Sequence, residues 1–178
     1  MMRFLAISGS LRRLSTNSAL LRAIEANAPD GIAVAPCQDI GGLPIFNPDR
    51  EGDLTPRAVQ DFAAKIDQAD GLIISCPEYA HGIPGGLKNA LDWLVSREEI
   101  PFKPAMLVRA SSRSDIALSA LQDVLRTMSV ALMPEIGISV PLLGKKAEDV
   151  DAILCDPETR ANLSAALIRF ASWVKESR

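Results

Sequence analysis

The sequence predicts an α/β protein in which helices cover both faces of a parallel sheet. Short, continuous apolar runs alternate along the chain with longer segments whose apolar residues recur at helical spacing. Apolar runs without polar alternation are typical of strands that are buried on both faces. Strands that alternate with helices in this way are joined by crossover connections and build a parallel sheet.

Five apolar runs have the length of strands. The first reads Phe4-Leu5-Ala6-Ile7, the second ends near Pro36, and the third contains Leu72-Ile73-Ile74. Such aliphatic and β-branched residues favour extended backbone in a buried sheet. The predicted strands cover residues 3–8, about 32–36, 71–75, about 104–109 and about 134–140.

Five segments have the periodicity of helices. The second begins with Thr55 as its N-cap and Pro56 at its first position, where the missing proline N–H costs no hydrogen bond. Apolar residues repeat along one face of this helix and of the last one. The predicted helices cover about 16–27, a segment from 55 that includes 59–66, about 85–97, about 116–131 and about 157–176, with irregular stretches at 37–54 and 140–156.

This pattern predicts the strand order 2-1-3-4-5. In a sheet of that order the topological switch lies between the first and third strands, and ligands bind beyond the carboxyl ends of those strands. The loops that follow them are therefore the first places to look for a site.

Composition limits the possible classes of protein. The chain of 178 residues is 48% hydrophobic, which predicts a single domain over residues 1–178 with a sizeable core. Its net charge of −3 and its lack of a basic block disfavour nucleic-acid partners. No apolar run reaches the roughly 18–20 residues that cross a bilayer, so membrane insertion is not expected. Cys37, Cys76 and Cys155 have no C-x-x-C spacing and predict reduced thiols in the cytoplasm, and one histidine leaves no histidine-rich metal site.

The loop after the first strand has the chemistry of an anion cradle. Gly9 and Ser10 are followed by Arg12 and by Ser15-Thr16 just before a helix. Backbone N–H groups, hydroxyls, a helix N-terminus and a guanidinium together suit a phosphate monoester. The alternative is that Ser15 or Thr16 only caps the helix and that Gly9 only permits a turn.

A second loop follows the third strand and also opens a helix. The motif G-S-L-R…S-x-N starts at Gly9, and P-E-Y-x-x-x-I-P-G-x-L-K-N-A-L-D-W starts at Pro77. Together they resemble the NADPH-dependent FMN reductase family, whose flavodoxin-like members include quinone, azo and chromate reductases. The resemblance implies a flavodoxin-like three-layer sandwich that binds FMN. It also implies hydride transfer from NADPH or NADH through the flavin to a small acceptor: a quinone, an azo compound, a metal oxyanion or free flavin.

The resemblance also assigns residues, without a catalytic side chain or a metal, because the flavin performs the chemistry. The loop after the fourth strand contributes Ser111, but residues 109–115 lack the glycines of many family members, and Ala80 replaces their asparagine. The positions that match the phosphate site are Ser10, Arg12, Ser15 and Asn17. Those that match the loop along the ribityl chain and ring are Pro77, Glu78, Tyr79, Ala80, His81 and Gly82.

Two other functions stay open. A flavodoxin-type electron carrier would share the fold, although such carriers usually have strongly acidic, aromatic flavin loops and no arginine in the phosphate loop. A nucleotide N-glycosidase-like hydrolase would use Glu78 as its nucleophile. For Glu78 we favour a structural role, in which its carboxylate accepts backbone N–H groups or pairs with an arginine across a subunit interface, and for His81 a place at the rim of the pocket.

The helices over about 85–97 and about 116–131 together predict a surface for self-association, with the clearest signal on the second of them. Leu118, Leu125 and Leu132 form a second apolar row beside the stripe that faces the sheet. A surface helix needs an apolar arc of only about 100°, so the extra row predicts a homodimer or homotetramer. The alternative is a wider core within one chain.

Overall fold

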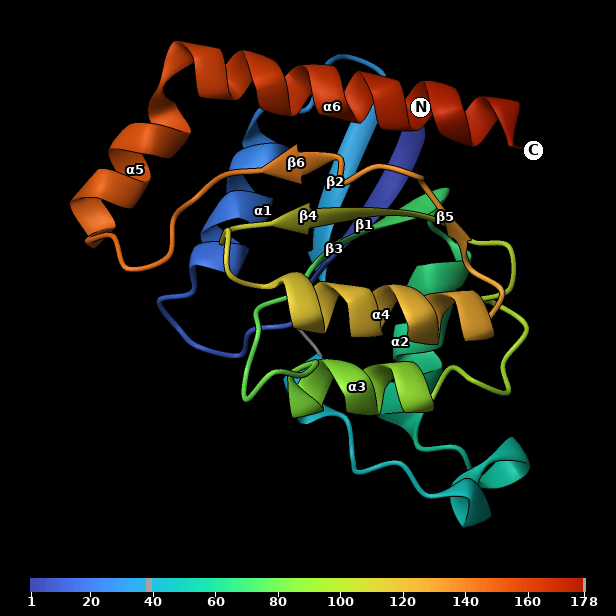
Figure 1. The fold of residues 1–178 in the computed structure, drawn as a ribbon. Helices are drawn as coiled ribbons and strands as arrows, with labels where there is room; N and C mark the ends of the chain where they lie inside the picture. Colours follow the sequence, from blue (N-terminus) through green and yellow to red (C-terminus); the bar gives the residue numbers. More distant parts are fainter. Residues whose placement is uncertain (38–39, 178) are drawn as a thin grey trace.

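A computed structural model describes residues 1–37 and 40–177 as a three-layer α/β sandwich (Figure 1). The strands are parallel and follow the order β2-β1-β3-β4-β5, with β6 also pairing with β4. This order confirms the predicted flavodoxin-like fold class. The strands are β1 (Met2–Ser8), β2 (Ile32–Cys37), β3 (Gly71–Ser75), β4 (Pro104–Arg109), β5 (Ala131–Leu132) and β6 (Ile138–Ser139).

Helices cover both faces of the sheet, and each face has its own buried core. In one core, Phe4 of β1 contacts Phe170 with ring centroids 4.6 Å apart. Helices α1 (Thr16–Ala26), α5 (Ala147–Cys155) and α6 (Pro157–Glu176) cover this face. The opposite face carries α2 (Arg57–Asp67), α3 (Gly85–Asp92) and α4 (Asp115–Thr127), and α2 is preceded by the 3₁₀ turns η1 (Ile40–Gly42), η2 (Pro48–Arg50) and η3 (Gly52–Leu54).

The loops after β1 and β3 lie against each other. Ser8 is in register with Ser75, and the backbone N–H of Gly9 donates to the Ser75 carbonyl at 2.8 Å. A Cβ on Gly9 would lie only 3.0 Å from a methyl of Leu87 and 3.1 Å from Pro77 Cδ. Glycine at position 9 therefore lets the two predicted ligand loops approach closely.

The predicted fifth strand over 134–140 is wrong in its bounds, because the strand is split into β5 and β6. Leu132 pairs with Ala105 and Ile138 pairs with Val108. The chain therefore advances by six residues from Leu132 to Ile138 while β4 advances by three. The extra residues include Pro134, which has no N–H to donate to a neighbouring strand. They form a bulge at the edge of the sheet.

Other boundaries also differ from the prediction. Helix α5 lies in the stretch 140–156 that was expected to be irregular, and α3 ends at Asp92, before the expected 97. Pro56 is the N-cap of α2 and not its first residue. Thr55 does not cap the helix, because its hydroxyl donates to the Gly52 carbonyl at 2.8 Å.

The prediction that the second apolar row of α4 faces a second copy is wrong. Leu118 and Leu125 are buried within this chain, with exposed fractions of 6% and 0%. Leu132 packs beside the same core. The second apolar row therefore widens the core of one chain, which is the alternative that the sequence left open.

Among the helices of the described residues, none combines the length and the hydropathy of a membrane span.

Candidate functional site

A cleft of about 90 Å³ opens where the loops after β1, β3 and β4 meet, at the carboxyl ends of the strands. It brings together eight of the predicted site residues, although they come from three distant parts of the sequence. Those eight are Ser10, Arg12, Ser15, Asn17, Pro77, Glu78, Tyr79 and Ser111. The other lining residues are Thr16, Arg113 and Leu143, of which Arg113 and Leu143 were not assigned to the flavin site from the sequence.

Hydrogen bonds fix the first loop at the N-terminus of α1. The Ser15 hydroxyl accepts from the Ser18 N–H at 3.3 Å, so Ser15 is the N-cap of α1, as the alternative to a phosphate site predicted. Ser15 also lines the cleft. Asn17 is buried, and its Oδ1 accepts from the Ser75 hydroxyl at 2.8 Å. This bond ties the loop to β3 and leaves the Asn17 NH₂ as a hydrogen-bond donor.

The guanidinium of Arg12 supplies the positive charge of this loop. Arg12 is exposed and forms no ion pair with any residue that the structure describes. A charged donor beside a helix N-terminus and two hydroxyls suits a phosphate dianion. The donors present at this end of the cleft therefore fit the phosphate of FMN.

Tyr79 begins a tight turn over 79–82. The N–H and carbonyl of Tyr79 exchange hydrogen bonds with those of Gly82 at 3.2 and 3.0 Å, and Ala80 and His81 both have positive φ, at 49° and 59°. Positive φ at both central residues defines a type I′ turn, in which non-glycine residues are strained. The Tyr79 hydroxyl lies 3.2 Å from Ser10 Oγ and so connects the two loops. Ala80, His81 and Gly82 do not line the cleft, and the first two are exposed at its rim.

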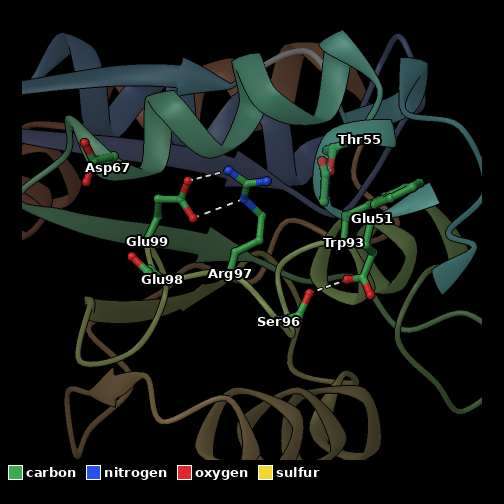
Figure 2. A pocket seen from close by; sticks show the side chains of 9 residues that line it. Glu51, Thr55, Asp67, Trp93, Ser96, Arg97, Glu98 and Glu99 are labelled. Carbon is green, nitrogen blue, oxygen red and sulfur yellow. Dashed lines mark hydrogen bonds and ion pairs between the residues drawn. The ribbon is translucent and has the colours of Figure 1, made fainter. Parts of the chain in front are cut away.

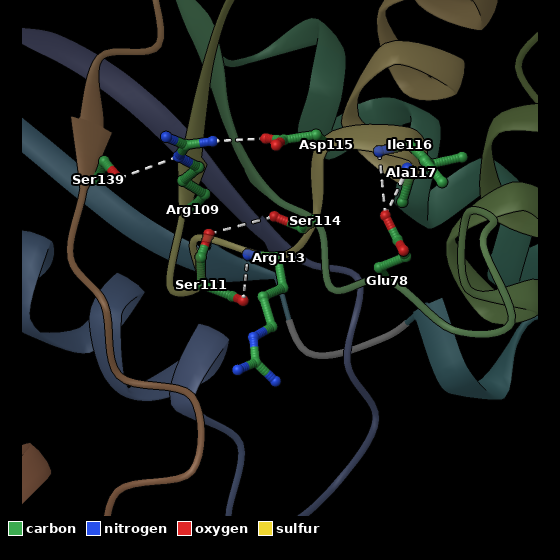
Figure 3. Close-up of polar contacts among 9 residues, drawn as sticks. All are labelled: Glu78, Arg109, Ser111, Arg113, Ser114, Asp115, Ile116, Ala117 and Ser139. Atoms are coloured by element: carbon green, nitrogen blue, oxygen red, sulfur yellow. Dashed lines mark hydrogen bonds and ion pairs between the residues drawn. The ribbon is translucent and has the colours of Figure 1, made fainter.

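Glu78 caps helix α4 from outside the helix (Figure 3). Its Oε2 accepts from the N–H groups of Ile116 and Ala117, both at 3.0 Å, while Ser114 at the N-cap position makes no capping hydrogen bond. His81 Nδ1 lies 3.3 Å from the other carboxylate oxygen. The predicted structural role of Glu78 is therefore confirmed, with backbone N–H groups as its partners.

The loop over 109–115 is held by its own polar contacts (Figure 3). Arg109 donates to Asp115 at 2.8 Å and to the Ser139 hydroxyl at 3.0 Å, so its charge is already paired. The Arg113 N–H donates to the Ser111 hydroxyl at 3.0 Å. The Arg113 side chain points away from the Arg109–Asp115 pair and lines the cleft.

A larger cavity of about 600 Å³ lies near the amino ends of β3 and β4 (Figure 2). Glu51, Asp67, Glu98 and Glu99 give it an acidic lining. Arg97 donates to Glu99 at 2.5 Å, and this hydrogen bond lowers the pKa of the Glu99 carboxyl. An acidic cavity whose arginine is already paired is poorly suited to a phosphate or a flavin.

The three cysteines are free, and two of them are buried. Burial raises the pKa of the Cys37 thiol, and burial followed by the nearby Glu78 charge raises that of Cys76 to about 12. The Cys76 thiol donates to the Pro77 carbonyl at 3.3 Å, so it packs under the loop as a neutral group. Among residues 1–37 and 40–177, no cluster of three or more histidine, cysteine or acidic side chains is arranged to hold a metal.

The model of the NADPH-dependent FMN reductase family matches residues 2–143. The chain belongs to this family. An NAD(P)H-dependent FMN reductase of Pseudomonas aeruginosa is 35% identical over 184 residues, which cover 99% of this chain and 97% of that protein. A 2-hydroxy-1,4-benzoquinone reductase of a Burkholderia species is 32% identical, with 99% and 98% covered.

Solved structures agree with this assignment. The flavoenzyme NAD(P)H:(acceptor) oxidoreductase FerB of Paracoccus denitrificans aligns over 99% of both chains with a TM-score of 0.81 and 25% identity. The azoreductase AzrA shares the fold at 16% identity and a TM-score of 0.57. The cofactor of this family is FMN, and the cationic and hydroxyl donors of the first loop fit its phosphate.

Proposed function

We propose that this member of the family transfers hydride from NADPH or NADH through bound FMN to a small acceptor. The observation that carries the proposal is the cleft at the topological switch, where Arg12 and the hydroxyls of one loop face the loop that begins at Pro77. Hydrogen-bond donors for a phosphate therefore lie next to a loop along which a flat ring would fit.

The proposed placement of FMN follows from the donors. The phosphate would be held by Ser10, Arg12, Ser15 and the NH₂ group of Asn17, through charge-assisted hydrogen bonds. The cleft of about 90 Å³ is well below the roughly 300–1,000 Å³ of sites that enclose whole ligands, so the ring would lie across the open rim. There it would face the turn 77–82 and Ser111.

The flavin, when bound, supplies the redox chemistry by accepting a hydride at the ring and passing electrons on. The side chains of this chain bind and orient it. Glu78 does so indirectly, because its carboxylate ties the loop after β3 to the start of α4 and thereby holds both walls of the cleft in place. Tyr79, at 46% exposed, offers an aromatic edge at the rim.

A quinone is the proposed acceptor. The support is the activity for which several relatives are named, among them quinone reductases of Escherichia coli and Pseudomonas putida at 30% and 33% identity. Azo compounds, metal oxyanions and free flavin are further candidates of the same class. An open rim beside the proposed ring position suits acceptors of different shapes.

The two rival functions have less support. A hydrolase would need the Glu78 carboxylate free to attack, whereas one of its oxygens already accepts two backbone N–H groups. An electron carrier would not need a nicotinamide cofactor, and the relatives named above are NAD(P)H-dependent enzymes or quinone reductases.

We further propose that residues 1–178 act as one FMN-binding domain in the cytoplasm, as a homodimer or homotetramer. The free cysteines favour a reducing compartment. Exposed apolar side chains at Val95, Phe102 and Ile116 offer surface for a second copy, with exposed fractions of 61%, 80% and 52%. Light scattering tests this, and a mass of 19.1 kDa would refute self-association.

The decisive experiment has two parts. Apoprotein is titrated with FMN and with riboflavin, and FMN is expected to bind more tightly because only FMN carries the phosphate. Equal affinities would refute the phosphate assignment. The FMN complex is then mixed anaerobically with NADPH and with NADH, and flavin that stays oxidised with both would refute the reductase function.

A further inference from the structure

A pocket of about 300 Å³ adjoins the flavin cleft on the side of the loop over 109–115, and we call it the side pocket. It lies between the loop after β4 and the chain that follows β6. Its lining residues are Ser112, Arg113, Pro141, Leu143 and Gly144. Arg113 and Leu143 also line the flavin cleft, so the two hollows meet at these side chains. None of the residues assigned to FMN from the sequence, all of which the structure describes, lines the side pocket.

Arg113 gives the side pocket a positive charge. It is exposed and forms no ion pair with any residue that the structure describes. Figure 3 shows its guanidinium pointing away from the Arg109–Asp115 pair. The nearby carboxylates already have partners, because Asp115 accepts from Arg109 and Glu78 accepts from the N–H groups that begin α4. The side pocket is therefore suited to a single negative charge.

The wall opposite Arg113 is apolar and held in place. Pro141 and Leu143 supply its surface, and the Leu143 side chain is open to a ligand because it is 58% exposed. The N–H of Leu142 donates to the Ala110 carbonyl at 2.9 Å, which fixes this wall to the end of β4. A ligand that covers the exposed apolar surface removes it from water, and this favours binding.

We propose that the side pocket holds the carboxylate arm of the electron acceptor, so that the chain prefers quinones with a carboxylate to neutral ones. The proposal rests on the proposed function, because the acceptor ring has to lie at the rim of the flavin cleft. The guanidinium of Arg113 presents parallel N–H groups that match the two oxygens of a carboxylate. The arm stays unchanged in the reaction: NADPH or NADH supplies a hydride, solvent supplies a proton, and the quinone becomes a hydroquinone.

A carboxylate matches the side pocket better than a phosphate monoester does. A phosphate dianion is commonly bound by free N–H groups at the start of a helix. At the start of α4 the N–H groups of Ile116 and Ala117 already donate to Glu78. One guanidinium and the Ser112 hydroxyl remain, and they balance one negative charge but not two.

The first test compares two quinones that share a ring and differ in charge. They are a 1,4-naphthoquinone with a propionate side chain and the methyl ester of the same compound. The FMN complex is reduced anaerobically with stoichiometric dithionite, which keeps the nicotinamide cofactor out of the measurement, and is then mixed with each quinone. Arg113→Ala is expected to lower the rate constant for the acid by about tenfold, the loss of one charged hydrogen-bonding partner, and that for the ester much less. Arg113→Lys, which keeps the charge without the fork, is expected to lie between wild type and Arg113→Ala.

Lys145→Ala is the matched control. Lys145 is an exposed cation directly after Gly144 and is not among the residues that line the side pocket. The control is expected to leave the rates for both quinones unchanged. The proposal is wrong if Lys145→Ala slows the acid as much as Arg113→Ala does, because the effect would then come from the general field. It is also wrong if Arg113→Ala slows acid and ester equally, because Arg113 would then act on the flavin. Thermal unfolding verifies that each variant is folded.

Two binding measurements keep this inference separate from the proposed function. The FMN affinity of Arg113→Ala is expected to stay close to that of the wild type, and a loss as large as that of Arg12→Ala would make Arg113 a phosphate ligand and refute the proposal. The second measurement titrates 3-(2-naphthyl)propionate, which cannot be reduced, and its neutral amide into the FMN complex and into apoprotein. The acid is expected to bind more tightly than the amide in the wild type and not in Arg113→Ala. Equal binding of acid and amide to the wild type would refute the side pocket, whereas flavin that is not bound or not reduced would refute the proposed function.

Discussion

Replacement of Glu78 tests whether one carboxylate joins two walls of the site. In Glu78→Ala the N–H groups of Ile116 and Ala117 lose their acceptor at the start of α4. Removal of a side-chain cap costs about 0.5–2 kcal/mol, and a partly buried charge at a helix terminus contributes up to about 2 kcal/mol. The two contributions arise from the same contact and overlap. Since the Glu78 side chain is only 15% exposed, we expect a loss of about 2 kcal/mol in the free energy of unfolding.

The assay is thermal and urea unfolding of apoprotein. For a chain of this length about 1 kcal/mol shifts Tm by about 2–4 °C, so Glu78→Ala is expected to lower Tm by about 4–8 °C. Glu78→Gln keeps an acceptor but loses the charge, and about half of the effect is expected. Glu135→Ala, at an exposed glutamate in the β5–β6 bulge, serves as control and should stay within about 0.5 kcal/mol of the wild type.

Two results would refute this reasoning. An unfolding free energy for Glu78→Ala equal to that of the control would mean that the carboxylate does not stabilise α4. Alternatively, Glu78→Gln that is fully stable yet loses all flavin reduction by NADPH would place the carboxylate in the chemistry and not in the scaffold.

Further substitutions test the remaining parts of the structure. Arg12→Ala is expected to weaken FMN by about 1.5–3 kcal/mol while riboflavin is unaffected, and a parallel loss for riboflavin would contradict a phosphate contact. Ala80→Asn is expected to raise stability by about 0.5–1 kcal/mol, because asparagine tolerates positive φ better than alanine, and a lower Tm would contradict the strained turn. Only exposed Cys155 should react with a thiol reagent in the native protein, since burial raises the pKa of the other two thiols; three equally reactive thiols would show that the packing is wrong. The hydrogen bond from Arg97 lowers the pKa of the Glu99 carboxyl below its ordinary value of 4.5. The pair therefore stabilises the fold fully at pH values above 4.5, and this stabilisation is lost as the pH falls below 4.5. The difference in free energy of unfolding between wild type and Glu99→Gln should therefore become smaller in acid. A difference that grows in acid would contradict the claim that Arg97 stabilises the ionised Glu99 carboxylate.

The sequence predicted the parts of the site that depend on local patterns. The strand order and the capping of α1 by Ser15 follow from apolar periodicity and from short-range residue preferences, and both are found in the structure. The split of the fifth strand depends on how 133–137 bulges against β4, where Met106 leaves no room for a side chain at Gly137. A one-dimensional pattern carries no signal for such a tertiary constraint. Helix α5 was missed because a helix of nine residues that buries only Val150 and Leu154 has weak periodicity.

Arg113 was not assigned to the flavin site from the sequence, for the same physical reason. Its position depends on the path of the loop over 109–115, which the sequence shows only as a loop without glycine. The partner of Glu78 was equally hidden, because a backbone N–H is present at nearly every residue and Ile116 lies 38 positions away. The sequence did indicate that the Glu78 carboxylate accepts hydrogen bonds, because a carboxylate beside a buried strand needs donors.

The glycine-poor loop over 109–115 changes how the wall of the cleft is built. Glycines in such a loop leave the backbone free to adapt to a ligand, at a cost in entropy when the loop becomes ordered. In this chain the Ser111 hydroxyl accepts from the Arg113 N–H, the Ser114 hydroxyl donates to the Ser111 carbonyl at 3.3 Å, and Arg109 pairs with Asp115. Glu78 then fastens the following helix to the opposite loop. Four sets of contacts therefore hold the wall in shape before any ligand arrives, and a preorganised wall lowers the ordering cost of binding a flat ring.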